Sequence, residues 1–435
     1  SEPAFTPVQP ERTPEKEDIP LNQIELLGSR AKAAARTLAI VSAEKKIQAL
    51  HAIADSLEQG QAEILAANAK DLAAAKDAGI RASMLDRLML DEARVHAIAQ
   101  AVRKVASLED PIGETLHGFL TPNGMNIRKV RVPLGVVGII YEARPNVTPD
   151  AASLCLKSSN AVILKGGKEA IRSNRCMAAL MRGALEQCSL PADAIQLIED
   201  TSRESTMQLM KCNRYVDVLI PRGGAGLISS VVQNATVPVI ETGTGNCHIY
   251  IDRDADLAMG AEILYNAKTS RPSVCNAAES LLVHKDIAET FLPMAKRRLD
   301  EKQVTWYGCE RVRKILGDEI LPAAPEEYGK EFLDFTLSAK VVDSLEEAIE
   351  HITTYGTGHS EAIITQNLRA SEEFTAKVDA AAVYVNASTR FTDGGEFGLG
   401  AEIGISTQKL HARGPMGLKE LTTVKYIING QGQIR

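Results

Sequence analysis

Hydrophobic and polar positions follow two different patterns along the chain. Residues 21–108 carry apolar side chains three and four positions apart, in segments rich in Ala, Leu, Glu and Lys, and this spacing predicts helices. Residues 117–132 form two extended runs around an Asn-Gly pair, which predicts a β-hairpin. Between residues 135 and 240, short apolar runs alternate with helical segments, and the last of these strands is predicted at residues 237–240. This alternation indicates βαβ units on a parallel sheet.

A second series of strand and helix patterns occupies residues 249–386, and residues 422–428 form a last extended run. We expect this run to pair with the hairpin, either within one chain or across a dimer. A chain of 435 residues exceeds what one hydrophobic core normally serves, so two domains are expected. Residues 1–20 are rich in Pro, Glu and Thr, and we expect a flexible, solvated tail there.

Composition narrows the classes of partner. A net charge of −7 at pH 7 argues against nucleic acid or an anionic membrane as the main partner. No stretch approaches the roughly 20 apolar residues of a membrane span. The seven cysteines have no Cys-x-x-Cys spacing and the eight histidines form no cluster, so neither a disulfide framework nor a metal site is predicted. We therefore expect a cytoplasmic protein.

Cys275 is the most informative residue for chemistry. It lies between a helical pattern at residues 261–268 and an apolar, strand-like run at residues 280–283, with small residues at positions 276–278. Such a connection can present a thiolate to a cleft, and we expect this cysteine to ionise without a neighbouring base. The alternative is a small buried hydrophobe, the usual fate of a free cysteine, and the local sequence alone favours this alternative.

Glycines and lysines at two strand ends are candidates for a nucleotide site. Gly223, Gly224 and Gly226 follow a predicted strand and open a predicted helix, where free N–H groups can hold a pyrophosphate. An ordinary turn between strand and helix is an equal alternative. Lys165 and Lys168 lie beside glycines at the end of another strand and can attract phosphates, with a solvated surface pair as the alternative. No P-loop motif occurs, which disfavours a P-loop kinase.

Several longer blocks are more specific than any glycine pattern, and they lie at residues 138–146, 164–170, 273–279, 385–393, 397–402 and 411–415. They resemble the aldehyde dehydrogenase superfamily and, within it, the branch that reduces L-glutamyl 5-phosphate in proline biosynthesis. The resemblance covers nearly all of the chain after the tail and implies an α/β, aldehyde dehydrogenase-like fold. The implied parts are a Rossmann-like cofactor-binding domain (residues 21–113 and 131–245), an α/β catalytic domain (246–416) and a small β oligomerisation module (114–130 and 417–435).

The resemblance also implies roles for single residues. Cys275 matches the nucleophile, and Asn146 matches the asparagine that stabilises the oxyanion. Lys165 matches a lysine near the adenosine ribose, and Lys168 replaces a ribose-binding glutamate that NAD-preferring relatives often carry, which favours NADP. Glu241 falls where oxidising relatives have a general base, but a reductase that releases phosphate needs no activated water.

Two arginines and a polar loop are candidates for substrate binding. Arg144 and Arg390 can bind the phosphate or the α-carboxylate of the substrate, and structural salt bridges are an equal alternative. Asn386, Ser388 and Thr389 lie on the loop after a predicted strand, where substrate contacts are expected.

The implied reaction is the NADPH-dependent reduction of L-glutamyl 5-phosphate to L-glutamate 5-semialdehyde, with release of phosphate, through a thioacyl intermediate on Cys275. The alternative enzyme is an oxidative semialdehyde dehydrogenase that produces a free acid, with Glu241 as its base. A non-catalytic scaffold of the same fold is an alternative of another class. A homo-oligomer, either dimer or tetramer, is expected, and the glutamate 5-kinase that supplies the acyl phosphate is a candidate partner.

Overall fold

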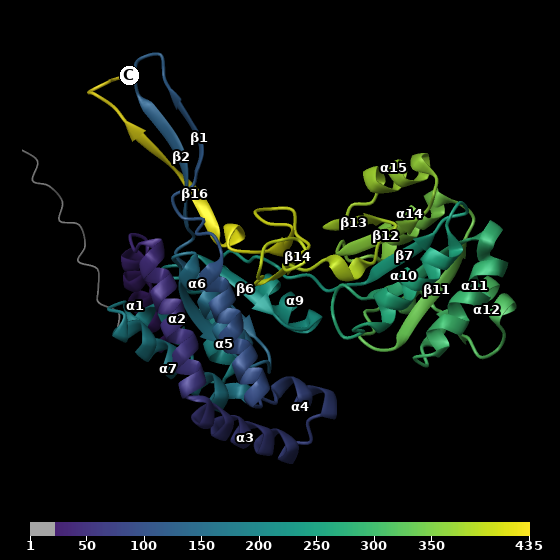
Figure 1. The fold of residues 1–435 in the computed structure, drawn as a ribbon, viewed down its shortest axis with the longest axis horizontal. Coiled ribbons are helices and arrows are strands. Elements are labelled where there is room, and N and C mark those ends of the chain that lie inside the picture. The colour runs from purple at the N-terminus through teal and green to yellow at the C-terminus, as the bar shows by residue number, and fades with distance from the viewer. Residues whose placement is uncertain (1–21) are drawn as a thin grey trace, which may run out of the picture.

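The computed structural model describes residues 22–435, so the tail predicted for residues 1–20 lies outside the described residues. Two α/β units lie side by side, and a three-stranded β arm projects from the first unit (Figure 1). The chain enters the second unit after α9 (Ala225–Asn234) and returns towards the first after β13 (Ala382–Val385).

The sheet of the first unit has four parallel strands in the order β5-β4-β3-β6. Its strands are β3 (Val136–Tyr141), β4 (Ala161–Lys165), β5 (Ile195–Leu197) and β6 (Val218–Arg222). Every residue of β3 and β4 is buried, as expected for strands covered on both faces. Because Ile140 pairs with Lys165 and Tyr141 with Arg222, the carboxyl ends of β3, β4 and β6 meet at one edge.

The strand predicted at residues 237–240 does not form as a full strand. Only an isolated bridge joins Val239 to Leu219. The reason is local: Pro238 has no N–H, so it can accept from Leu219 but cannot extend a ladder of hydrogen bonds.

Helices cover this first sheet, and the N-terminal one begins with a capping box. The Asn22 side chain accepts from the Glu25 N–H at 2.9 Å, and the Glu25 carboxylate accepts from the Asn22 N–H at 3.0 Å. Besides α9, the helices and 3-10 turns of this unit are α1 (Gln23–Leu38), which carries this capping box, α2 (Ala43–Gln59), α3 (Gln61–Asp77), α4 (Ala82–Leu88), α5 (Glu92–Ser107), α6 (Val147–Lys157), α7 (Ile171–Gln187), α8 (Arg203–Met210), η1 (Lys168–Ala170) and η2 (Ala192–Ala194).

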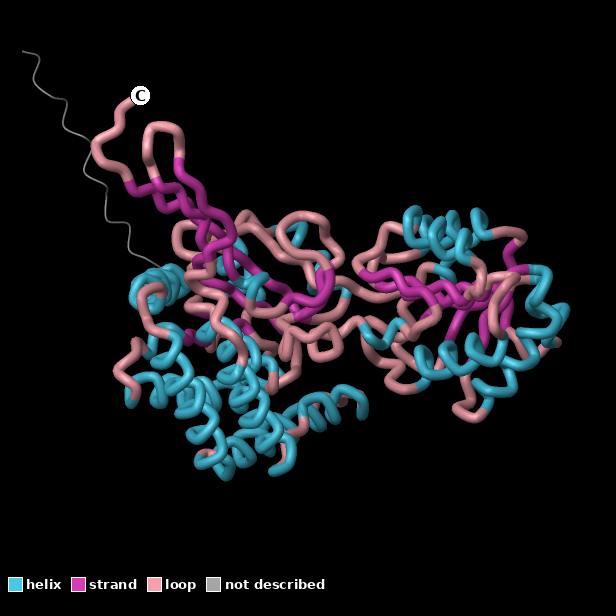
Figure 2. The backbone as a smooth tube through the Cα atoms, turned by 45° about the horizontal axis from the view of Figure 1, so that its top comes forward, coloured by secondary structure: helices cyan, strands magenta, loops and turns pink. Residues whose placement is uncertain are grey.

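The second unit contains a seven-stranded sheet in which every neighbouring pair is parallel. Successive side chains face opposite sides: Ile249 and Leu281 pack with Phe291 on one face, whereas Tyr250 and Leu282 pack on the other. Helices therefore lie on both faces of the sheet (Figure 2).

In the order of the sheet, the strands of the second unit are β10 (Leu321–Pro322), β9 (Thr305–Gly308), β11 (Thr336–Val342), β8 (Ala278–His284), β7 (Cys247–Ile251), β12 (Ser360–Ile364) and β13. Its helices are α10 (Leu257–Thr269), α11 (Lys285–Asp300), α12 (Glu310–Leu316), α13 (Pro325–Tyr328), α14 (Leu345–Tyr355) and α15 (Leu368–Lys377). The connection from α10 to β8 agrees with the helix-to-strand connection predicted around Cys275.

The arm consists of β1 (Thr115–Leu120), β2 (Asn126–Pro133) and β16 (Thr422–Asn429). The predicted hairpin is confirmed, and the C-terminal run pairs with β2 within the same chain. The arm exposes large apolar side chains, among them Leu120 at 72% and Tyr426 at 60%. Apolar surface of this kind is typical of contact with another chain, and the oligomerisation role of the arm stays a prediction.

Short elements complete the path from the second unit to the arm, namely η3 (Thr389–Phe391), β14 (Gly404–Ser406), β15 (Gly414–Met416) and η4 (Lys419–Leu421). No helix within residues 22–435 has the length and apolar character needed to cross a membrane. The same residues contain no group of three or more His, Cys, Asp or Glu side chains that could hold a metal ion.

Candidate active site

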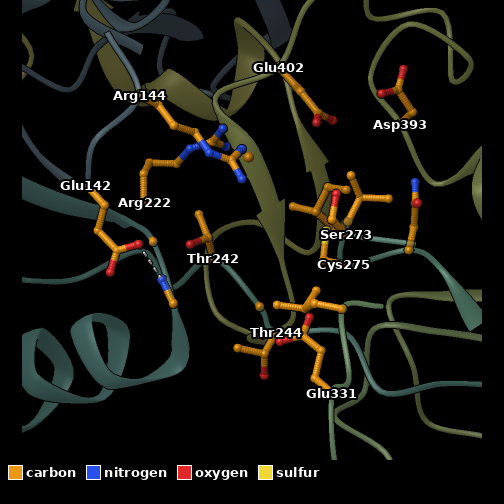
Figure 3. Close-up of a pocket in the computed structure, with 18 of the residues that line it drawn as sticks. Glu142, Arg144, Arg222, Thr242, Thr244, Ser273, Cys275, Glu331, Asp393 and Glu402 are labelled. Atoms are coloured by element: carbon orange, nitrogen blue, oxygen red, sulfur yellow. Dashed lines mark hydrogen bonds between the residues drawn. The ribbon is translucent and has the colours of Figure 1, made fainter. Parts of the chain in front are cut away.

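A cavity of about 350 Å³ opens where the carboxyl edge of the first sheet faces the start of β8 (Figure 3). Both α/β units and the segment between η3 and β14 contribute to its lining. Cys275 lies in this lining, together with five arginines and four acidic residues, which are Arg87, Arg144, Arg222, Arg271, Arg390, Glu142, Glu331, Asp393 and Glu402.

Backbone contacts fix the turn that carries Cys275. Gly245 lies so close that a Cβ atom built on it would be 1.4 Å from the Cys275 carbonyl oxygen. The Asn276 Nδ2 donates to the carbonyl oxygen of Thr392 at 2.9 Å, and the Thr389 hydroxyl donates to the Asn276 carbonyl oxygen at 2.7 Å. Two separate segments, one at Gly245 and the other at residues 389–392, therefore hold the turn in place.

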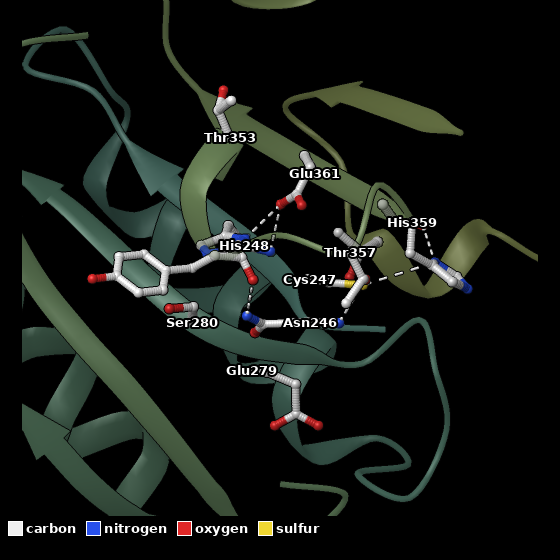
Figure 4. A network of polar contacts seen from close by, with 12 residues as sticks. Asn246, Cys247, His248, Glu279, Ser280, Thr353, Thr357, His359 and Glu361 are labelled. Carbon is white, nitrogen blue, oxygen red and sulfur yellow. Dashed lines mark hydrogen bonds and ion pairs between the residues drawn. The ribbon is translucent and has the colours of Figure 1, made fainter. Parts of the chain in front are cut away.

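Figure 4 shows a buried polar network at the start of β7, and one member of it, Cys247, contacts the turn that carries Cys275. The Cys247 thiol donates to the Cys275 carbonyl oxygen at 3.2 Å, and burial holds the pKa of Cys247 well above its usual range, so it stays a donor. The Asn246 Nδ2 donates to the carbonyl oxygens of Tyr328 and Tyr355 at 2.7 and 2.8 Å. These bonds tie the start of β7 to both the nucleophile turn and the loops beside it.

The thiol of Cys275 has an unfavourable environment for ionisation. Burial raises its pKa to about 11, the nearby carboxylates of Glu331 and Glu402 add to the rise, and Arg222 opposes them. The expectation that this cysteine ionises without help is therefore wrong for this structure. Lys268, which is near in sequence, gives no help because it forms a buried ion pair with Glu279 at 2.8 Å.

Three other arginines of the cavity lie near enough to Arg144 for their charges to act on it. The guanidinium groups of Arg144 and Arg222 lie close together (Figure 3). Burial lowers the pKa of Arg144, and the positive charges of Arg87, Arg222 and Arg271 lower it further. Arg144 and the three arginines whose charges act on it together make a strongly positive region, which suits a phosphate group.

Arg87 and Arg222 were missed by sequence reasoning, for different reasons. Arg222 is the last residue of β6, and its place at the same sheet edge as Arg144 was a usable signal. Arg87 comes from the short helix α4, and nothing in its local pattern shows that this helix reaches the cavity.

In the polar loop predicted to bind substrate, most side chains bond to the backbone of the protein and do not face the cavity. Asn386, whose φ is +56°, bonds through its side chain to the backbone of Thr365. Ser388 caps η3, and Thr389 is fully buried against the nucleophile turn. Arg390 alone of these residues lines the cavity, where its guanidinium donates to the side chain of Asn276 and to the Ser270 hydroxyl at 3.1 Å.

The residues predicted to bind the cofactor lie along the carboxyl edge of the first sheet. Gly223 and Gly224 line the cavity and begin α9, and the Gly224 N–H donates to the Glu142 carboxylate at 3.2 Å. Gly226 lies in the first turn of α9 and is exposed. Lys165 is buried at the end of β4 and Lys168 is exposed at the start of η1. The chain between the two lysines folds back on β3, because Gly167 packs against the backbone of Glu142 and Ala143.

Asn146 and Glu241 are not among the residues that line the cavity. Asn146 is exposed at the start of α6, and its Nδ2 donates to the Asp150 carboxylate at 3.1 Å. The backbone N–H of Glu241 donates to the side chain of Gln408 at 2.6 Å. The oxyanion role of Asn146 stays a prediction.

Comparison with known proteins agrees with this architecture. The aldehyde dehydrogenase family model matches residues 4–306. The γ-glutamyl phosphate reductase of Clostridium perfringens is 61% identical over 414 residues, which are 95% of this chain and 100% of that protein. The crystal structure of γ-glutamyl phosphate reductase from Thermotoga maritima is similar with a TM-score of 0.93 and 45% identity, covering 95% of this chain and 100% of that chain.

A more distant structure shares the fold alone. It is an acetylating aldehyde dehydrogenase from Geobacillus thermoglucosidasius, with a TM-score of 0.67 and 18% identity over 95% of this chain and 97% of that chain. Fold and matches together define an oxidoreductase that acts on an aldehyde or an acyl phosphate. The chain belongs to the aldehyde dehydrogenase family, in its γ-glutamyl phosphate reductase branch.

Proposed function

We propose that this protein reduces L-glutamyl 5-phosphate to L-glutamate 5-semialdehyde with NADPH, in proline biosynthesis, and that Cys275 is the nucleophile. The observation that carries the proposal is the cavity itself, which brings a cysteine on a rigid turn together with a cluster of arginines. The names of the similar proteins from Clostridium perfringens and Thermotoga maritima support the same substrate.

In this mechanism the Cys275 thiolate adds to the γ-carbonyl carbon of the acyl phosphate. Arg144 and Arg222 hold the phosphate, the bond between that carbon and the phosphate oxygen breaks, and phosphate leaves as an anion. An acyl phosphate already has a good leaving group, so the chain mainly positions the substrate and stabilises developing negative charge. Backbone N–H groups of the nucleophile turn are available for the oxyanion, and Asn146 can join them if its side chain turns away from Asp150.

The cofactor-binding residues suit an anionic dinucleotide. The Gly224 N–H at the start of α9 already donates to the carboxylate of Glu142, so it can hold an anion there. Lys165 and Lys168 form no ion pair with any residue in the range 22–435, which leaves both available to the 2′-phosphate of NADP. When bound, NADPH supplies the hydride that turns the thioester on Cys275 into an aldehyde and frees the thiolate.

The assembly and location of the protein are also proposals. The apolar surface of the arm suits a homo-oligomer, either dimer or tetramer, and the glutamate 5-kinase that makes the acyl phosphate is a candidate partner. All seven cysteines are free thiols in this structure, which suits the reducing cytoplasm.

The reverse reaction tests the proposed function. Oxidation of glutamate 5-semialdehyde with NADP should require inorganic phosphate, and hydroxylamine should trap an acyl phosphate product. Arg144→Gln should raise the KM for phosphate more than the KM for NADP. Arg369→Gln changes an exposed arginine on α15 and serves as the matched control. NADP reduction at full rate without phosphate, with glutamate as product, would establish the oxidative dehydrogenase instead.

A further inference from the structure

The charged side chains of the cavity are unusual because they form no ion pairs with one another. Five arginines and four acidic residues line it, yet none of them forms an ion pair with any part of the chain that the structure describes. Six of these nine side chains are partly buried, and a partly buried charge without an ion-pair partner is unfavourable for folding. Groups of both signs held in this way are suited to a ligand that itself carries both signs.

Glu402 is held in position by the backbone of its own loop. The Gly394 N–H donates to its Oε2 at 2.8 Å. A Cβ atom on Gly394 would lie 2.7 Å from the Glu402 Cβ, so the backbone packs closely against this side chain. Its other oxygen, Oε1, has no hydrogen-bond partner within residues 22–435. One carboxylate oxygen is therefore fixed, and the second is available to a ligand.

The surroundings of Glu402 favour a cation. Burial raises the pKa of Glu402, the negative charge of Asp393 adds to this rise, and Arg222 opposes it. Asp393 is itself held by the N–H groups of Gly395 and Glu396, so the two acids cannot easily separate. Figure 3 shows the Glu402 carboxylate between the Arg144 and Arg222 guanidiniums and Asp393.

The other two acidic residues of the cavity lie elsewhere. Glu142 accepts from the Gly224 N–H at the start of α9, on the cofactor side. Glu331 accepts from the Gly245 N–H at 2.8 Å, below the nucleophile turn in Figure 3. Of the acidic residues in the cavity, Glu402 has the carboxylate on which the negative charge of Asp393 acts, and the pair is the better match to a positively charged group.

We propose that Glu402 determines substrate specificity by binding the α-ammonium group of the substrate, with Asp393 beside it. This inference rests on the proposed function, because it names the residue that binds the α-ammonium group of the same substrate. Arginines then hold the phosphate, and Glu402 selects a chain that carries an amino group over the same chain without one. The bound ammonium also offsets part of the negative potential at Cys275.

The test compares two aldehydes in the phosphate-dependent reverse reaction. One is glutamate 5-semialdehyde, and the other is 5-oxopentanoate, which has the same chain and carboxylate but no amino group. The quantity measured is the ratio of their kcat/KM values, in wild type and in Glu402→Gln. Because the fraction of semialdehyde lost to cyclisation is the same in both proteins, it cancels when the two ratios are compared.

Glu402→Gln should lower kcat/KM for glutamate 5-semialdehyde by about tenfold to a hundredfold, which is the loss expected for one charge-assisted hydrogen bond. The value for 5-oxopentanoate should change by less than about threefold on the same basis. Glutamine can still accept the Gly394 N–H, so the loop should keep its shape. Asp393→Asn is the second variant and should shift the ratio in the same direction by a smaller factor.

Glu331→Gln is the matched control, since it removes another carboxylate from the same cavity, and it should leave the ratio of the two aldehydes unchanged. An equal loss on both aldehydes in Glu402→Gln, or the same shift of the ratio in Glu331→Gln, would overturn the assignment. Failure of the proposed function is distinguishable, because wild type would then oxidise glutamate 5-semialdehyde without any need for phosphate.

Discussion

The ionisation of Cys275 gives the most direct quantitative prediction. With a pKa of about 11, the thiol is almost fully protonated at neutral pH. At pH 8 about one protein in a thousand would carry the thiolate, against about one in four for an ordinary cysteine with a pKa near 8.5. Alkylation, which needs the thiolate, should therefore be slower at Cys275 by roughly two hundredfold than at a cysteine in an unstructured peptide.

The assay is alkylation by iodoacetamide at a series of pH values, on protein without added substrate or cofactor, with the Cys275 peptide followed by mass spectrometry. The rate should rise about tenfold per pH unit from pH 8 and level off near pH 11. Glu331→Gln removes a negative charge that opposes ionisation, so the midpoint should move down. Arg222→Gln removes the favourable cation, so the midpoint should move up.

Two results would refute this reasoning. A midpoint near 8.5 in wild type would mean that the thiol is not desolvated as its surroundings require. A midpoint that rises in Glu331→Gln, or falls in Arg222→Gln, would mean that these side chains do not act on the sulfur through their charges.

Two further substitutions test the geometry of the turn and the place of the cofactor phosphate. Gly245→Ala puts a methyl group where the Cys275 carbonyl oxygen lies, so the turn must shift, and kcat/KM should fall by about a hundredfold or more while NADP binding measured by fluorescence persists. Wild-type activity in this variant would show that the turn is not held tightly. Lys168→Glu should narrow or reverse the preference for NADPH over NADH, and an unchanged ratio of kcat/KM values for the two cofactors would remove Lys168 from the 2′-phosphate site.

The fold could be predicted well where the local pattern of apolar residues agrees with the element that the tertiary structure requires. Strands β3 and β4 are short apolar runs followed by helices, and both formed as the pattern predicts because parallel strands are buried on both faces. The pattern failed at residues 237–240, where a proline interrupts an otherwise apolar run. It also gave no signal for β14 and β15, which have three residues each and owe their form to pairing with one another.

The site was predictable only in part, because its residues come together from distant segments. The small residues around Cys275 marked the nucleophile turn, a strand end marked the glycines of α9, and the family resemblance of residues 138–146 pointed to Arg144. The spacing of Arg390 gave no information on its partner, Asn276, which is 114 positions away. Glu402 belongs to a recognised block, but its importance depends on the packing of Gly394 against it, which no local pattern encodes.

The arrangement of charge also suggests why the thiol is protected until the substrate arrives. Glu402 and Glu331 oppose ionisation of Cys275, and Arg222, which favours it, lies in the cluster proposed to bind phosphate. If the substrate ammonium occupies Glu402, one source of opposing charge is neutralised at the moment when the γ-carbonyl is in place. A nucleophile that ionises mainly with its substrate bound is less exposed to oxidation and to other electrophiles, because both reactions need the thiolate. The unpaired charges of the cavity then serve both to recognise the substrate and to delay ionisation of the thiol until the substrate is bound.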